Sequence, residues 1–170
     1  MSGADRLLSA LLRAPQRVFG VADAAAWTGL APVALSRALG KAARLGAVLR
    51  LKRGVWASLA GGRPHPFEAV PYLSAPWPSC VSLYSALAAH GVVAETPSVT
   101  YAVTAGPPFR LRTPLGEYSF HHLPARLLWG WETRRAPGAA YPLADAEKAF
   151  LDTLYLAGVP RSPIRLPPRR

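Results

Sequence analysis

The alternation of hydrophobic and polar positions is clearest in residues 31–59, where a helical period gives way to a strand period. Apolar residues recur there at intervals of three and four, which predicts a helix with one buried face. These residues are Leu35, Leu39, Ala42 and Leu45. Pro32 suits the first helical turn, where a missing N–H costs nothing, and Gly46 suits the left-handed residue just past the end. We therefore expect this helix to end near Leu45.

Two short β-prone runs follow this helix, at residues 48–52 and 55–59. They are joined by Arg53-Gly54, and a two-residue connection with glycine at a position of positive φ is typical of a β-hairpin. Upstream, leucines at helical spacing predict a helix over residues 5–13, and a second helix over 21–28 is closed by Gly29. Helix, helix, turn, helix and hairpin in about sixty residues is the order of a winged helix-turn-helix.

Residues 60–66 are rich in glycine and proline and predict a domain boundary. Beyond it we expect a helix over 79–89, strands within 98–105, 109–114, 116–123 and 127–134, and a last helix over 145–157. The packing stripe expected on the last helix comprises Ala149, Phe150, Thr153, Leu154 and Leu156. The predicted fold class is α+β. A winged helix-turn-helix domain (residues 1–62) precedes a small α+β domain with an antiparallel sheet (63–160), and a basic Pro/Arg tail (161–170) is expected to be mobile.

The positive charge of the chain is unevenly distributed. Twenty Lys and Arg against nine Asp and Glu give a formal net charge of +11. Residues 1–62 hold nine basic and two acidic residues, residues 63–160 hold seven of each, and the tail adds four arginines. A strong positive field favours a polyanionic partner. Its concentration in the first 62 residues and the tail indicates that the helix-turn-helix segment, rather than the α+β body, meets that partner.

The candidate DNA-binding residues lie on the third predicted helix and on the hairpin that follows it. Arg37, Lys41 and Arg44 are spaced i, i+4 and i+7, which places them on one helix face. A helix-turn-helix inserts such a face into the major groove, where arginine and serine reach base edges and wing residues meet phosphates. The complete predicted set is Ser36, Arg37, Lys41, Arg44, Arg50, Lys52 and Arg53. The alternative is a solvated basic face on a module that binds protein.

The sequence favours neither an enzyme nor a metalloprotein. His121 and His122 are adjacent on a predicted strand and should point to opposite faces, so they cannot share one metal ion. Lys148 and Asp152 are spaced for a surface ion pair on the last helix, and Glu147 lies about 100° away, so we predict no catalytic role for them. A single cysteine excludes an internal disulfide. We expect no cofactor.

The remaining expectations concern aromatic residues and location. A region of zero net charge contains Trp77, Trp129, Trp131, Tyr118 and Tyr141, so we expect them to pack in the core or between the domains rather than stack on single-stranded nucleic acid. No apolar run is long enough to span a bilayer, and the first residues lack the features of a signal peptide. We therefore expect a cytoplasmic protein that does not associate with membranes.

Four short motifs in the second half together resemble the AbiEi antitoxin family of type IV toxin-antitoxin systems. They are the run 78–87 (PSCVSLYSAL), His90-Gly91, the run 113–118 (TPLGEY) with His121-His122, and the run 144–152 (ADAEKAFLD). They occur in the same order and with similar gaps as in the family. Tyr84, Ala146 and Phe150 depart from the residues usual there, namely glutamate, proline and leucine.

The resemblance implies a winged-helix transcriptional regulator followed by an antitoxin domain. It implies a repressor that binds inverted repeats in double-stranded DNA of its own promoter. It also implies a functional partner, a nucleotidyltransferase-like toxin, which the antitoxin opposes without a stable complex. A different possibility remains open from the residues themselves: the second domain could be a protein-interaction module or a nucleic-acid-processing enzyme, delivered by the first.

Overall fold

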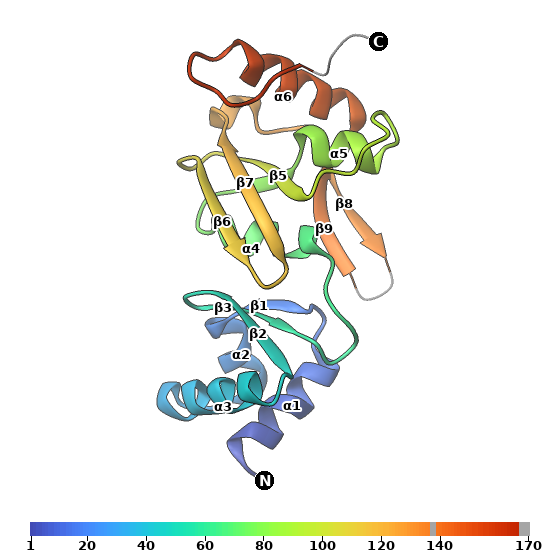
Figure 1. Ribbon diagram of the computed structural model, residues 1–170. Coiled ribbons are helices and arrows are strands. Elements are labelled where there is room, and N and C mark those ends of the chain that lie inside the picture. The colour runs from blue at the N-terminus through green and yellow to red at the C-terminus, as the bar shows by residue number, and fades with distance from the viewer. Residues whose placement is uncertain (137–138, 167–170) are drawn as a thin grey trace.

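The N-terminal part is built from three helices and three short strands (Figure 1). The computed structural model describes residues 1–136 and 139–166. The elements in chain order are α1 (Gly3–Arg13), β1 (Val18–Gly20), α2 (Val21–Thr28), α3 (Pro32–Arg44), β2 (Val48–Lys52) and β3 (Val55–Ser58). The strands form an antiparallel sheet in the order β1-β3-β2. The three predicted helices and the hairpin are confirmed at these positions.

Local signals set the ends of these elements. Ser2 and Asp5 cap the start of α1 reciprocally, each side chain bonding the other's backbone N–H. Gly29 and Gly46 follow α2 and α3 with φ of +64° and +71°, the left-handed conformation that glycine adopts at low cost. One core prediction is wrong: Leu45 is 65% exposed, because α3 ends at Arg44 and the chain turns away before Leu45 can join the buried face.

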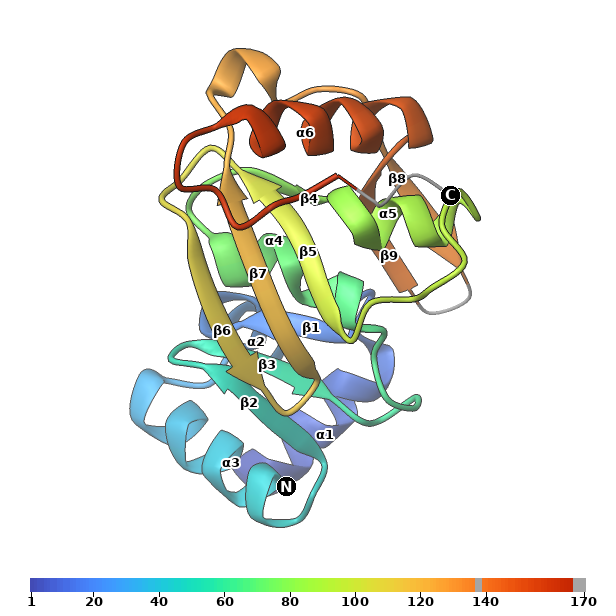
Figure 2. The same ribbon diagram turned by 45° about the horizontal axis from the view of Figure 1, so that its top comes forward.

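The second part contains a six-stranded sheet with helices packed on it (Figure 2). Its elements are η1 (Pro66–Ala69), α4 (Val70–Ser74), β4 (Ser79–Val81), α5 (Leu83–Ala89), β5 (Val99–Thr104), β6 (Phe109–Thr113), β7 (Gly116–His122), η2 (Ala125–Leu127), β8 (Trp131–Ala136), β9 (Ala139–Ala144) and α6 (Ala146–Gly158). The strand order is β6-β7-β5-β4-β9-β8. The molecule is thus α+β.

The expected antiparallel sheet in the second part is wrong, because the sheet is mixed. β5 pairs parallel with β7, and β4 pairs parallel with β9. The cause lies in the order of the strands: β6 forms a hairpin with β7 and occupies the edge, so β7 returns beside β5 in the same direction.

The predicted helix over 79–89 is two elements in the structure. Ser79–Val81 form β4, and Cys80 and Val81 are fully buried between β5 and β9. Ser82 is the N-cap of α5, and Leu83, the first residue of the helix, has φ of +52°, a conformation that is unusual for a leucine. The helix prediction failed because a three-residue buried strand carries no alternating pattern. The strand expected at 127–134 begins only at Trp131, after η2.

Two hydrophobic clusters lie on opposite faces of the N-terminal sheet. Phe19 and Val48 pack with the helices, whereas Val18, Val55 and Ala57 belong to the cluster that continues into the second part. Residues 59–65 connect the parts without forming a helix or strand. The predicted boundary therefore lies on a connection, although apolar packing crosses it.

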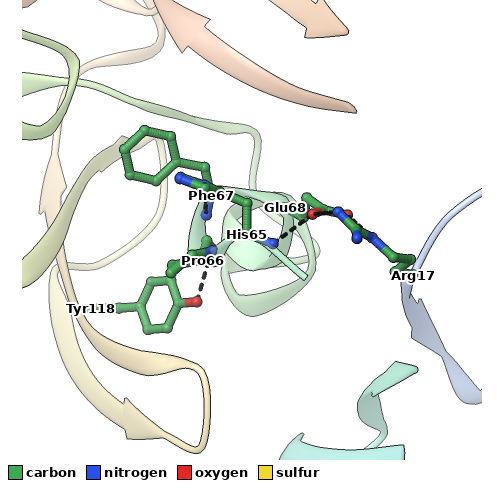
Figure 3. A network of polar contacts seen from close by, with 6 residues as sticks. All are labelled: Arg17, His65, Pro66, Phe67, Glu68 and Tyr118. Atoms are coloured by element: carbon green, nitrogen blue, oxygen red, sulfur yellow. Dashed lines mark hydrogen bonds and ion pairs between the residues drawn. The ribbon is translucent and has the colours of Figure 1, made fainter. Parts of the chain in front are cut away.

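Polar contacts also join the two parts (Figure 3). Arg17, just before β1, forms an ion pair with Glu68 in η1, and the Glu68 carboxylate also accepts the backbone N–H of His65 at 2.7 Å. The Tyr118 hydroxyl donates to the carbonyl of Pro66 at 2.8 Å. The connection is consequently held by both β1 and β7. At the other end of the molecule α6 lies far from α3 in both views (Figures 1 and 2).

Two predictions near the C-terminus are wrong. Phe150 and Leu154 are 47% and 40% exposed, because the inner face of α6 carries the buried Lys148 and Asp152 and the two apolar side chains turn outward. The tail is not free over 161–166, since Ile164 is buried in the core of the second part and the backbone of Arg165 bonds the Tyr84 hydroxyl. Its last residues, 167–170, lie outside the described part of the chain.

Candidate nucleic-acid interface

The outward face of α3 carries the predicted cationic stripe. Arg37, Lys41 and Arg44 are all exposed, and so is Ser36 beside them. The opposite face of the helix is buried against α1 and the N-terminal sheet through Leu35, Ala38, Leu39 and Ala42. Burial of the apolar face therefore fixes which side of α3 meets solvent. At the helix start, Val33 is 65% exposed on this outer side, although it is not among the predicted site residues.

The cationic stripe is not neutralised by ion pairs within the described part of the chain. Among the described residues, no carboxylate forms an ion pair with Arg37, Lys41 or Arg44. Lys41 interacts with Asp5 only through longer-range electrostatics. The pKa of Asp5 is lowered mainly by hydrogen bonds from Ser2, with a smaller contribution from the charge of Lys41. Exposed, unpaired cations on one helix face are available to a polyanion.

The hairpin has the predicted two-residue tip. Arg53-Gly54 connects β2 to β3, and Gly54 takes φ of +78°. Arg53 is exposed there. Arg50 is also exposed, and its guanidinium carbon lies 5.8 Å from the centre of the Trp56 ring on the paired strand. Both residues are thus placed to meet solvent.

Lys52 does not extend into solvent, in contrast to its expected position at the tip of the hairpin. Strand pairing steps from Arg50 opposite Trp56 to Lys52 opposite Val55, so Leu51 is the extra residue of a β-bulge. The bulge turns Lys52 toward the second part, where its Nζ donates a hydrogen bond of 2.7 Å to the carbonyl of Leu73. Burial lowers the pKa of this half-buried amine. The expected position of Lys52 at a projecting tip is therefore not seen, and its contact with phosphate stays a prediction.

Lys148 and Asp152 form the predicted ion pair, but the pair is buried rather than on the surface. Each side chain is only 3% exposed. Asp152 also accepts a hydrogen bond of 2.7 Å from Ser82, and the Lys148 amine lies 5.2 Å from the centre of the Trp129 ring. Burial raises the pKa of Asp152, opposed by the hydrogen bonds from Lys148 and Ser82. These contacts fix α6 on the sheet, and the adjacent Glu147 is exposed.

The two histidines point to opposite faces of β7, as predicted. His121 is buried and its Nε2 lies 2.9 Å from the Ser119 hydroxyl, whereas His122 is exposed and bonds the carbonyl of Gly106. Burial, with a smaller effect of Arg110, lowers the pKa of His121 to about 4. Within the described residues, no three His, Cys, Asp or Glu side chains form a group suited to a metal ion.

The predicted burial of the aromatic residues holds for the tyrosines only in part and fails for the tryptophans. Tyr118 is buried and Tyr141 is half-buried against His65. Trp77, Trp129 and Trp131 are 51%, 52% and 37% exposed. Helix and strand periodicity carries no information about Trp77 and Trp129, because both lie in connections between elements.

In the part of the chain that the structure describes, no helix has the length and apolar character needed to cross a membrane. Comparison with known proteins leaves the family open: no protein-family model matches the sequence, and no curated protein matches it significantly.

Proposed function

We propose that the chain binds double-stranded DNA through α3 and the β2–β3 hairpin, as a winged helix-turn-helix does. The observation that carries this proposal is the exposed face of α3, where Arg37, Lys41 and Arg44 have no acidic partner among the described residues. A helix-turn-helix places such a face in the major groove. Arginine and lysine there donate to guanine O6 and N7 or to phosphates.

The distribution of charge supports this surface over the rest of the molecule. Residues 1–62 carry seven of the eleven net positive charges, and α3 lies at the end of the molecule away from α6 (Figure 1). Arg50 and Arg53 add exposed cations on the hairpin, in the position of a wing that follows the phosphate backbone. We leave Lys52 out of the proposed DNA-binding residues, because its amine bonds the Leu73 carbonyl on the side of the second part.

The biological role proposed for the DNA binding is repression of the chain's own promoter, as part of an antitoxin of the AbiEi type. This step rests on the resemblance of the four motifs and not on geometry. In this role a nucleotidyltransferase-like toxin is the functional partner, opposed without a stable complex. Expression of the gene product of the neighbouring reading frame, with and without this chain, tests the antitoxin role by cell growth.

DNA binding is tested by fluorescence anisotropy with a duplex from the region upstream of the gene. The test variant carries Arg37→Gln, Lys41→Gln and Arg44→Gln. A matched control removes three exposed arginines elsewhere, Arg126→Gln, Arg135→Gln and Arg161→Gln, so both variants lose the same charge. We expect the α3 variant to lose about 100-fold or more in affinity at fixed salt, and the control to lose less than about tenfold. Equal losses would show that only net charge matters and would remove α3 from the proposal.

A further inference from the structure

A groove lies beside the hairpin, between the two parts of the molecule. It is bounded by Lys52 of β2 and by residues 73–77, which form the end of α4 and the loop after it. The other wall is formed by Pro107, Phe109 and Leu111, just before and within β6. Its volume is about 380 Å³, within the range of small-molecule sites, and most of its lining is apolar. Junctions between packed units are a common place for such sites.

One wall of the groove is fixed by buried hydrogen bonds. The hydroxyl of Ser74 lies 2.6 Å from that of Ser79, and Ser74 also donates to the carbonyl of Trp77 at 3.1 Å. The backbone N–H of Trp77 donates a hydrogen bond of 3.0 Å to the Ser74 carbonyl. The loop that presents Trp77 is therefore held in place without a ligand, and a preformed wall lowers the entropic cost of binding.

Two aromatic rings line the groove, and each is supported from behind. The Trp77 ring lies directly on the backbone of Gly106, where any Cβ would overlap the indole, yet 51% of the residue remains exposed. Phe109 stacks on Phe120 with ring centroids 4.4 Å apart. An exposed indole of fixed orientation is suited to contact with another planar ring.

Among the described residues that line the groove, Lys52 is the one with a charged side chain. Its ammonium makes one hydrogen bond, to the carbonyl of Leu73, and no carboxylate among the described residues pairs with it. An ammonium has three N–H donors, so two remain for another acceptor. The residues that line the groove include no aspartate or glutamate. The charge that complements this site is thus a single negative one.

We propose that this groove binds a small organic anion in which an aromatic ring is joined to a carboxylate. The carboxylate bonds the Lys52 ammonium, and the ring lies against Trp77 and Phe109. The proposal is independent of DNA binding, because Lys52 is turned away from the solvent around the hairpin tip.

Indole-3-acetate is the probe, and indole-3-acetamide and cyclohexylacetate are its neutral and non-aromatic counterparts. Binding to the full chain is measured by isothermal titration calorimetry and saturation-transfer NMR. We expect one saturable site for indole-3-acetate, with a dissociation constant on the order of 0.1–1 mM. Removing the negative charge or the aromatic ring from the probe should each weaken binding by about tenfold or more.

Substitutions locate the probe on the protein. Lys52→Gln should weaken binding by about tenfold or more and Trp77→Leu by about three- to tenfold, while thermal unfolding shows that both variants are folded. Arg161→Gln, which removes an exposed cation after α6, should leave binding unchanged. Phe150→Ser removes an exposed aromatic residue on α6 and should also have no effect. The proposal is overturned if indole-3-acetate shows no saturable binding up to about 10 mM, if folded Lys52→Gln binds it equally, or if Phe150→Ser abolishes binding.

Discussion

Arg17 and Glu68 form an ion pair across the junction of the two parts, with Nη2 of the arginine 2.5 Å from Oε1 of the glutamate. The two partners are not equally buried, since the Glu68 side chain is 4% exposed and that of Arg17 is 21% exposed (Figure 3). Glu68 additionally accepts the backbone N–H of His65, so its carboxylate fixes the connecting segment as well as β1.

The unequal burial predicts unequal effects of the two single substitutions. Arg17→Met leaves a buried carboxylate without its cation and should lower the free energy of unfolding by about 2–4 kcal/mol. Glu68→Gln leaves an arginine that can reach water and should cost about 1–2 kcal/mol. Urea unfolding of both variants and of the double variant gives the coupling energy. A larger loss for Glu68→Gln than for Arg17→Met would contradict this reading of the pair.

His121 should make stability depend on pH. Its pKa is about 4 in the folded protein, because burial disfavours the charged ring, against 6.5 in the unfolded chain. Between these values the unfolded chain binds more protons, so the free energy of unfolding falls as the pH is lowered from 6.5 to 4. The loss attributable to His121 is on the order of 2–3 kcal/mol. Unfolding midpoints of His121→Gln should vary less over this window, while those of His122→Gln, at the exposed neighbour, should follow the unsubstituted chain.

Gly130 should be sensitive to a single added methyl group. It has φ of +73°, and a Cβ there would lie 2.9 Å from Cγ of Lys148, whose side chain is held by the buried pair with Asp152. Gly91 has nearly the same φ, +72°, but open space around it. Gly91→Ala should therefore cost about 1 kcal/mol, the conformational strain alone, and Gly130→Ala about 1–3 kcal/mol more. Equal losses of unfolding free energy in urea would mean that the Lys148 side chain moves aside without an energetic cost.

The N-terminal elements could be predicted because their signals are local. Gly29, Gly46 and Gly54 take the positive φ that their positions after helices and in a hairpin require. The stripe of Leu35, Leu39 and Ala42 identifies the buried face of α3, and the exposure of Arg37 and Lys41 follows from it. The candidate DNA-binding face can thus be predicted from the spacing of apolar residues within α3 alone.

The second part could not be predicted to the same extent, because its arrangement depends on distant partners. β4 is three residues long and lies between β5 and β9. In its pairing with β9, Val81 lies opposite Leu143, which is about sixty residues away in the sequence. The residues near Val81 in the sequence do not indicate which strand pairs with β4. The buried Lys148 and Asp152 have the same cause, since their spacing predicts the pair but not the sheet and the Trp129 ring that cover it.

Lys52 and Arg53 give the last prediction, since they are adjacent in sequence but differ in what they contact. Strict alternation would place Lys52 on the same face of the hairpin as Arg50, and the bulge at Leu51 places it instead against the second part. If the hairpin lies along the phosphate backbone, Arg53→Gln should reduce the slope of log affinity against log salt by about one, because one phosphate contact is lost. Lys52→Gln should leave this slope unchanged, because its ammonium faces the groove beside Leu73 and lies away from the solvent around the hairpin tip. The slope is measured by anisotropy over a series of salt concentrations. A reduced slope for Lys52→Gln would mean that the side chain leaves Leu73 when DNA binds, and an unchanged slope for Arg53→Gln would exclude the hairpin tip from the interface.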